Sequence, residues 1–170
     1  MISIRDEIAA DIPAVRIVNE RAFGRKAEAD IVDAIRGACS EIVSFVAIEK
    51  AQVVGHIMFS PVTVDGSAVH GGMGLAPVAV LPEKQRLGIG SQLVRAGIVR
   101  LREAGCPFII VLGHSEYYPR FGFVPASRRG LKSQWEGVSD NVFMALVLNE
   151  EVMKDVRGVA RYRPELDSAA

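Results

Sequence analysis

The stretch that most constrains the fold is residues 75–112, where two apolar segments flank a glycine-containing loop and a helix. Leu75–Val80 is short and almost wholly apolar, and Phe108–Leu112 is a continuous apolar run, typical of a strand buried on both faces. Between them, the apolar residues have the spacing of an amphipathic helix over 89–104, mostly on one side: Ile89, Leu93, Ala96, Val99 and Leu101. If the two strands are parallel, this unit is a right-handed crossover.

The rest of the chain alternates between helical and strand patterns. Asp11 and Pro13 predict the start of a helix that runs to about Phe23, with Asp11 as its cap. The other expected elements are a strand at Ile2–Arg5, a helix at 27–37, a hairpin of Ile42–Glu49 with Val53–Thr63, and a last clear strand at Val142–Leu148. This order predicts an α/β (α+β) fold with a mixed sheet and helices on both faces.

Pro77 interrupts the first apolar segment of the crossover. Proline has no N–H to donate, so it marks a bulge or a place where strand pairing stops.

Length and charge narrow the class of protein. With 170 residues we expect one domain, 1–170, in which 149–170 forms a loosely held C-terminal extension. Twenty basic residues balance twenty acidic ones, which argues against nucleic acid or an anionic membrane as a partner. Cys39 and Cys106 lie far apart without metal-ligand spacing, so no metal is expected. No apolar run is long enough for a membrane helix or a signal peptide, which predicts a cytoplasmic protein with reduced thiols.

The loop before the helix has the features of an anion site. Gly88 and Gly90 have no side chains to block a ligand, and successive amides can point one way at the positive end of the helix. Gln85 and Arg86 could add side-chain donors. The spacing fits neither a P-loop nor a dinucleotide fingerprint, and two glycines that merely begin a helix are an equal alternative on this loop alone.

Two linked motifs carry a family resemblance. The string VAVLPEKQRLGIGSQL contains QxxGxG between a strand and a helix, and VLGHSEYYPRFGF follows one strand later. Together they resemble the GNAT superfamily of acyl-CoA-dependent N-acyltransferases, in its bacterial YhbS-like branch. The resemblance spans about residues 2–148 and implies a mainly antiparallel sheet of about seven strands with one splayed strand pair.

The resemblance also implies acetyl-CoA as co-substrate. The pantetheine arm would lie beside the backbone of Val78, Ala79 and Val80, where Pro77 already breaks the ladder. Pyrophosphate contacts would come from Gln85, Arg86 and the amides of Leu87, Gly88, Ile89, Gly90 and Ser91.

Tyr118 lies four residues before the glycine of the GF pair, where family members often carry the tyrosine that protonates the departing CoA thiolate. A core tyrosine with a satisfied hydroxyl is the alternative. Tyr117, Phe121 and Phe123 are assigned to packing. The asparagine that many members carry at the end of the second splayed strand is missing, and His114 or Ser115 are candidates to replace it.

No general base is identified. The acid that many members carry on the first splayed strand is absent, and the remaining candidates are Glu20, Glu28, His56 and His70, each of which also has a structural explanation.

These features predict acetyl transfer to a primary amine of a small molecule or protein by direct attack, since no nucleophilic triad is recognisable. A non-catalytic acyl-CoA sensor is the main alternative, and an interaction domain without a cofactor is a third. The acceptor is not encoded in any recognisable motif, and a homodimer is compatible with the sequence.

Overall fold

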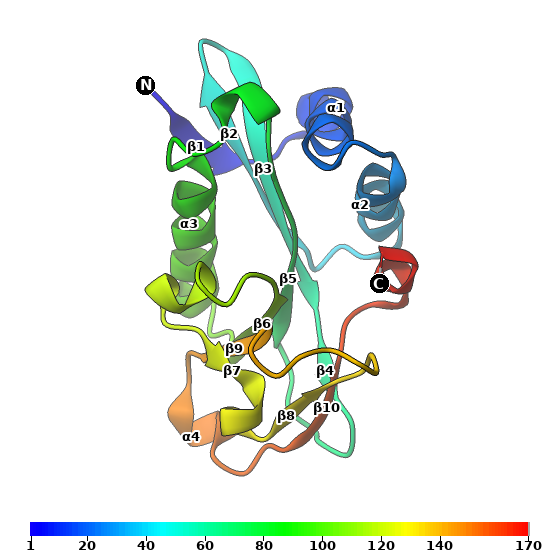
Figure 1. Cartoon of the computed structure of the whole chain (residues 1–170), viewed down its shortest axis with the longest axis vertical. Helices are drawn as coiled ribbons and strands as arrows, with labels where there is room; N and C mark the ends of the chain where they lie inside the picture. Colours follow the sequence, from blue (N-terminus) through cyan, green and yellow to red (C-terminus); the bar gives the residue numbers. More distant parts are fainter. Residues whose placement is uncertain (170) are drawn as a thin grey trace. The chain divides into compact units, whose positions relative to one another are not determined.

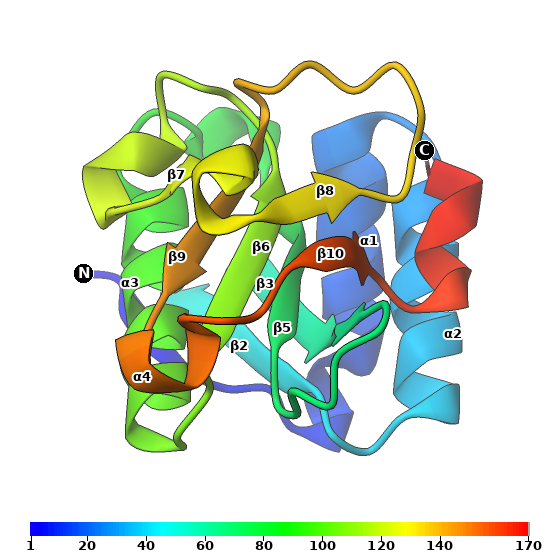
Figure 2. The ribbon, with the colours of Figure 1, turned by 90° about the horizontal axis from the view of Figure 1, so that it is seen from below.

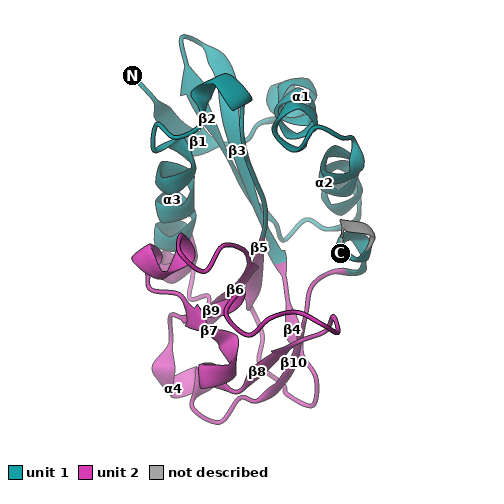
Figure 3. Ribbon diagram, in the orientation of Figure 1, with its two compact units in different colours: residues 1–60, 76–100, 164–170 teal, residues 61–75, 101–163 magenta. Residues whose placement is uncertain are grey.

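The computed structural model describes residues 1–169, which form two compact units. Unit 1 contains residues 1–60, 76–100 and the C-terminal segment from Pro164, and unit 2 contains residues 61–75 and 101–163 (Figure 3). Each unit has its own buried side chains.

Unit 1 is built on an antiparallel arrangement of β1 (Ser3–Asp6), β2 (Val43–Glu49) and β3 (Gln52–Pro61). The β2–β3 hairpin turns at Lys50 and Ala51, which both have positive φ angles of 50° and 63°. Two such residues are typical of the tight turn whose twist matches that of paired strands. The predicted hairpin is thus confirmed.

Helices cover both sides of these strands. α1 (Ile12–Phe23) and α2 (Ala27–Ala38) pack together on one side, and α3 (Ile89–Glu103) lies on the other (Figures 1 and 2). α3 approaches β3 closely because Gly97 leaves room for the ring of Phe59: a Cβ at Gly97 would lie 2.2 Å from that ring. The predicted helices and strands of this unit are present, and their bounds agree with the sequence prediction to within one or two residues.

Two local predictions were wrong. The Asp11 carboxylate does not cap α1; it accepts hydrogen bonds from the Ile8 amide at 2.8 Å and from Arg5 Nη1 at 2.7 Å. Because Arg5 and the Ile8 amide bind this carboxylate, it does not accept a hydrogen bond from the first amides of α1. Val99 is 51% exposed because it follows buried Ile98 and points about 100° away from it around the helix.

Unit 2 centres on β6 (Phe108–Leu112). It pairs in parallel with the first residues of β5 (Met73–Val80) and antiparallel with β9 (Phe143–Val147), which also pairs with β7 (Val124–Pro125). The predicted parallel strands at the ends of the crossover are confirmed.

A second, three-stranded sheet in unit 2 was not predicted. Its order is β4 (Thr63–Val64), β10 (Gly158–Arg161) and β8 (Leu131–Ser133). These strands are two to four residues long, too short for a pattern of alternation, so β9 is the last strand with a clear signal in the sequence. From Asn149 onward the chain also forms α4 (Glu150–Met153) and the 3-10 helix η5 (Pro164–Ala169).

Hydrogen bonding orders the main sheet as β1-β2-β3-β5-β6-β9-β7, a mixed and mainly antiparallel sheet of seven strands. The predicted fold class is confirmed. The remaining short 3-10 helices are η1 (Ala9–Asp11), η2 (Pro82–Lys84), η3 (Tyr118–Phe121) and η4 (Ala126–Arg129).

The contact between α3 and β3 can be tested by adding one methyl group. Gly97→Ala should destabilise the protein by about 1–3 kcal/mol because the new Cβ overlaps the Phe59 ring. Gly37→Ala is the matched control: it lies in α2 with nothing within 4 Å of its Cβ position, so alanine should stabilise the protein by ~0.5–1 kcal/mol. Urea unfolding measures both, and equal effects of the two substitutions would contradict the packing described here.

Candidate functional site

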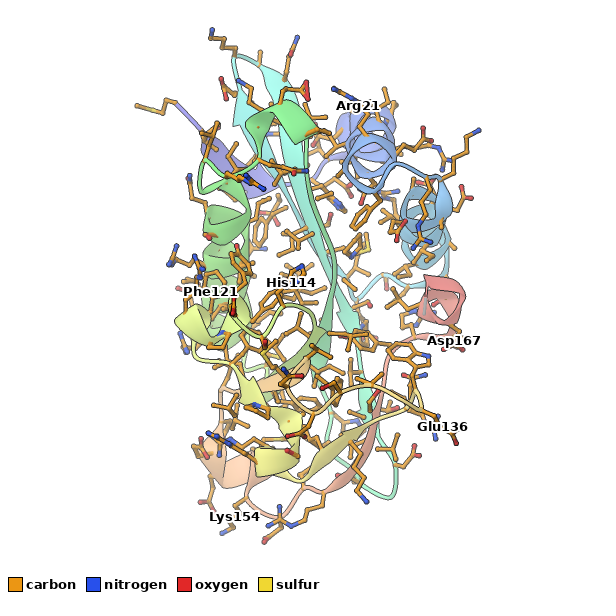
Figure 4. The ribbon with its side chains drawn as sticks, viewed as in Figure 1. Arg21, His114, Phe121, Glu136, Lys154 and Asp167 are labelled. Carbon is orange, nitrogen blue, oxygen red and sulfur yellow. The ribbon has the colours of Figure 1, made fainter. Side chains whose placement is uncertain are left out.

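The glycine loop of unit 1 is fastened to its neighbours at several points. The Leu81 amide donates to the Val54 carbonyl of β3 at 3.0 Å. In η2, Lys84 Nζ binds Glu49 Oε1 at the end of β2 at 2.9 Å. Arg21, which projects from the last turn of α1 (Figure 4), binds the Glu83 carboxylate at 2.8 and 3.0 Å. The loop therefore has a defined position relative to β2, β3 and α1.

The loop conformation depends on two left-handed residues, Arg86 with φ 65° and Gly88 with φ 85°. α3 begins directly after them at Ile89, and its first helical hydrogen bond runs from the Gln92 amide to the Gly88 carbonyl at 3.1 Å. The amides of the first helical turn lie at the positive end of the helix dipole, where anions are favoured. A Cβ at Gly88 would meet nothing within 4 Å, so its left-handed φ, and not crowding by the protein, favours glycine there.

The side chain of Gln85 has a local partner. Its Nε2 donates to the Val80 carbonyl at 2.9 Å, which ties the loop back to the end of β5. Arg86 is exposed. Of the two side chains predicted to donate to an anion, Arg86 extends into solvent, while Gln85 holds the backbone that carries the amides.

β5 has a short ladder with β6. Met73, Gly74 and Leu75 pair with Ile109, Ile110 and Val111, and this described ladder stops before Pro77. Further along β5, Ala79 is buried, while Val78 and Val80 are half-buried. Pro77 follows a cis peptide bond and has no N–H, as expected for a position at which pairing is interrupted.

The aromatic segment after β6 surrounds Tyr118, which is 6% exposed. Its ring centroid lies 5.0 Å from that of Tyr117, 5.7 Å from Phe123 and 6.2 Å from Phe121. These contacts agree with the packing roles that the sequence predicts for Tyr117, Phe121 and Phe123. They form a rigid apolar surround for one phenol.

The backbone of the same segment sets the direction of Tyr118. The His114 carbonyl accepts hydrogen bonds from the Tyr117 and Tyr118 amides. η3 then ends at Gly122, which has a φ of 100°. His114 and Phe121, which lie on either side of Tyr118 in the sequence, are labelled in Figure 4. A Cβ at Gly113 would lie 2.3 Å from Tyr118 Cε2. Gly113 thus allows the ring to lie directly on the backbone at the end of β6. Sequence reasoning missed this role, although a glycine directly after an apolar strand was a visible signal.

Burial raises the pKa of the Tyr118 phenol, and the neighbouring Tyr117 adds to the shift. The phenol therefore carries its proton at neutral pH and can donate a hydrogen bond or a proton.

His56, one of the candidate bases, is fully buried in unit 1 and has structural partners. Asn19 Nδ2 lies 3.1 Å from Nδ1 and Ser44 Oγ lies 2.9 Å from Nε2. Because an amide nitrogen only donates, Nδ1 accepts and the proton is on Nε2. That tautomer cannot take a proton from Ser44, which rules out a serine–histidine nucleophile here. Burial, with a contribution from the charge of Arg36, lowers the pKa of His56 to about 3.

The other candidate bases are less enclosed. Arg25 hydrogen-bonds Glu28 and lowers the pKa of that carboxyl, which makes it a weaker base. Glu20 pairs with Arg16 at 2.8 Å within α1. His70 is an exposed side chain of unit 2. Of the two residues predicted to replace the missing asparagine, His114 is exposed and Ser115 is half-buried.

Within residues 1–169 no group of three or more His, Cys, Asp or Glu side chains is arranged to hold a metal ion. Burial raises the pKa of Cys106 to about 11, so this thiol is protonated at neutral pH. Among the described helices, none has the length and apolar character that a membrane crossing requires.

Comparison with known proteins decides the family. A model of the acetyltransferase (GNAT) family matches residues 13–123, which include the glycine loop and Tyr118. The chain belongs to the GNAT family. This GNAT chain is 41% identical over 121 residues to the uncharacterised N-acetyltransferase YjhQ of Escherichia coli K12, covering 69% of this chain and 67% of YjhQ. It is 33% identical over 160 residues to the uncharacterised N-acetyltransferase YhbS of the same strain, covering 94% and 95% of the two chains.

Solved structures of GNAT proteins agree. YhbS from Escherichia coli, in complex with CoA, matches with a TM-score of 0.90 and 31% identity over 98% of this chain and 92% of that one. A GNAT acetyltransferase from Brucella melitensis, in complex with acetyl-CoA, matches with a TM-score of 0.82 and 36% identity over 98% and 99% of the chains. The predicted family, its YhbS-like character and the enzyme class, N-acetyltransferase, are confirmed.

The buried state of His56 predicts a pH dependence of stability. Its folded pKa lies below the ordinary value of 6.5, so the unfolded chain binds a proton first as the pH falls. His56 should therefore reduce the free energy of unfolding between pH 6.5 and about 3, with a slope of up to ~1.4 kcal/mol per pH unit. Urea unfolding of wild type and His56→Gln across this range measures it, with pH 8 as the baseline at which the imidazole is neutral in both states. Parallel pH curves for the two proteins would contradict a buried, neutral His56.

Proposed function

We propose that this GNAT protein transfers the acetyl group of acetyl-CoA to a primary amine by direct attack, with Tyr118 as the general acid. One observation carries the proposal: this GNAT chain has two features together. The loop before a helix contains left-handed Arg86 and Gly88, and a buried, protonated phenol lies on Gly113. The complexes of YhbS with CoA and of the Brucella protein with acetyl-CoA support the co-substrate.

We assign the diphosphate to the start of α3 in unit 1. The amides of Leu87, Gly88, Ile89, Gly90 and Ser91 would bind its oxygens, with Arg86 as an additional cation. Gln85 would contribute indirectly, through its bond to the Val80 carbonyl. The pantetheine amides would pair with the backbone of Val78, Ala79 and Val80, beyond the described β5–β6 ladder.

In the reaction, the neutral amine attacks the thioester carbonyl carbon and the C–S bond of the tetrahedral intermediate breaks. The sulfur leaves with the electron pair and takes the phenol proton of Tyr118, while the nitrogen loses a proton to water. Solvent then reprotonates the phenolate, so the products are the N-acetyl amine and CoA thiol. An ordinary phenol (pKa ~10) is a weaker acid than a thiol (~8.5), but burial that raises the pKa of Tyr118 also disfavours a thiolate at the same place.

The acceptor class stays a primary amine of a small molecule or of a protein, in accordance with the chemistry of the family. A homodimer and a cytoplasmic location stay predictions from the sequence.

The proton-donor role predicts the effect of removing one hydroxyl. Tyr118→Phe should lower kcat by about 10²–10³-fold because the thiolate must leave without a donor, and should change acetyl-CoA affinity little. Thiol release from acetyl-CoA in the presence of a panel of amines measures kcat. Tyr117→Phe, which removes the hydroxyl of the adjacent packing residue, is the matched control and should keep wild-type turnover. Full turnover by Tyr118→Phe would remove the assigned acid.

The anion site predicts a charge-specific loss of binding. Gly88→Asp should weaken CoA binding by about tenfold or more through repulsion of the diphosphate, while the isosteric Gly88→Asn should lose much less. Gly24→Asp controls for the backbone, since Gly24 has a similar left-handed φ of 69° and equally open space at the end of α1. Calorimetry with CoA measures the affinities, and unchanged binding in Gly88→Asp would exclude the assigned diphosphate site.

The same assays test the alternative of an acyl-CoA sensor, which the missing strand carboxylate favours. Tight acetyl-CoA binding by the wild-type protein, with no thiol release for any amine, would support the sensor and contradict the transferase.

A further inference from the structure

Tyr162, directly after β10, has its side chain enclosed within unit 2 and is 6% exposed. Its amide donates to Gln134 Oε1 at 2.7 Å, which fixes the backbone where β10 ends. The ring stacks on Trp135, the single tryptophan, with centroids 5.5 Å apart and an interplanar angle of 25°. Nothing in the local sequence around Tyr162 indicated an enclosed phenol.

The ring of Tyr162 lies directly on the backbone of β5. A Cβ at Gly74 would be 2.3 Å from Cε1 and 2.6 Å from Cδ1 of this ring. Gly74 pairs with Ile110 of β6, so the ring crosses β5 within the described β5–β6 ladder.

The hydroxyl of Tyr162 reaches the backbone of β6. It lies 3.4 Å from the Ile110 carbonyl oxygen, and the nearby backbone of Leu112 partly offsets the rise in the pKa of the phenol. These two residues flank Val111, the last β6 residue of the described ladder. The contact with Ile110 is longer than the usual ~2.7–2.8 Å of an O–H···O bond, so it contributes less than a bond of ordinary length, and the ring on Gly74 supplies the other contact with the ladder.

The second phenol of this region is Tyr118, whose ring lies on Gly113, the next residue after Leu112. Burial raises the pKa of Tyr162, and the charge of an ionised Tyr118 adds to the rise. Both side chains are thus neutral donors beside the last residues of β6 at neutral pH.

We infer that Tyr162 is a positioning residue of the acetyl-transfer site, whose hydroxyl fixes the end of the β5–β6 ladder beside Tyr118. This inference rests on the proposed function of Tyr118. Its physical basis is that a proton donor must be held within a fraction of an ångström of its working position, and that the glycine on which Tyr118 lies directly follows β6. A loss of the Tyr162 hydroxyl should therefore slow the chemical step without weakening the binding of the nucleotide part of CoA.

The decisive variant is Tyr162→Phe, which keeps the ring against Gly74 and Trp135 and removes only the hydroxyl. We expect kcat to fall about threefold, the low end for loss of one hydrogen bond because the contact with Ile110 is long, with the KM for acetyl-CoA unchanged. Trp135 emission, which reports the stacked ring, should stay unchanged. Tyr117→Phe is the matched control for loss of a phenol hydroxyl in the same unit and should keep wild-type kcat and KM.

Two other results for Tyr162→Phe would overturn the inference. Wild-type kcat in Tyr162→Phe, with wild-type Trp135 emission, would make Tyr162 a core residue only and overturn the inference. A variant that loses its folded Trp135 emission would show that the hydroxyl is needed for folding and would also overturn it. If the wild-type protein itself releases no thiol with any amine, the proposed function fails and this inference fails with it, whereas an active wild type with equal turnover in Tyr162→Phe overturns the inference alone.

Discussion

Close contact between aromatic rings and bare backbone is the constraint on which the structure depends most. Phe59, Phe108, Tyr118 and Tyr162 each lie on a glycine, where an added Cβ would be 2.2–2.3 Å from the ring. In unit 1 this contact sets how near α3 comes to β3. In unit 2 it sets where two phenols lie along β5 and β6. Since no side chain separates ring from backbone at these points, a single methyl group would displace the ring, and with it the strand or the hydroxyl that it holds.

The proposed chemistry needs a site for an anion and a side chain that stays neutral, and the two units differ in which of these they contain. In unit 1, a loop anchored by Leu81, Lys84 and Glu83 leads into the positive end of α3, to which we assign the diphosphate. In unit 2, burial keeps the phenols of Tyr118 and Tyr162 protonated at neutral pH, as the roles proposed for them require. β5 belongs to both units, with Met73–Leu75 in one and Ala76–Val80 in the other.

Buried polar groups elsewhere are structural. The neutral imidazole of His56 joins β3 to α1 through Asn19 and to β2 through Ser44, and its tautomer is set by the amide that donates to it. The Arg5–Asp11 pair similarly ties β1 to the start of α1. This network explains why His56, one of the candidate bases, has no access to a substrate.

The sequence by itself determined the crossover of residues 75–112, the hairpin and the helix bounds, because each depends on local spacing. It also singled out the loop with Gly88 and Tyr118 as candidate site residues, because both lie in short motifs. It did not determine that Asp11 binds Arg5, that Gln85 bonds to the Val80 carbonyl, or that Gly113 seats Tyr118. The second sheet and the enclosure of Tyr162 were also beyond it. These features arise from contacts whose geometry depends on how the chain folds back on itself, so only the tertiary structure decided which glycine lies beneath which ring.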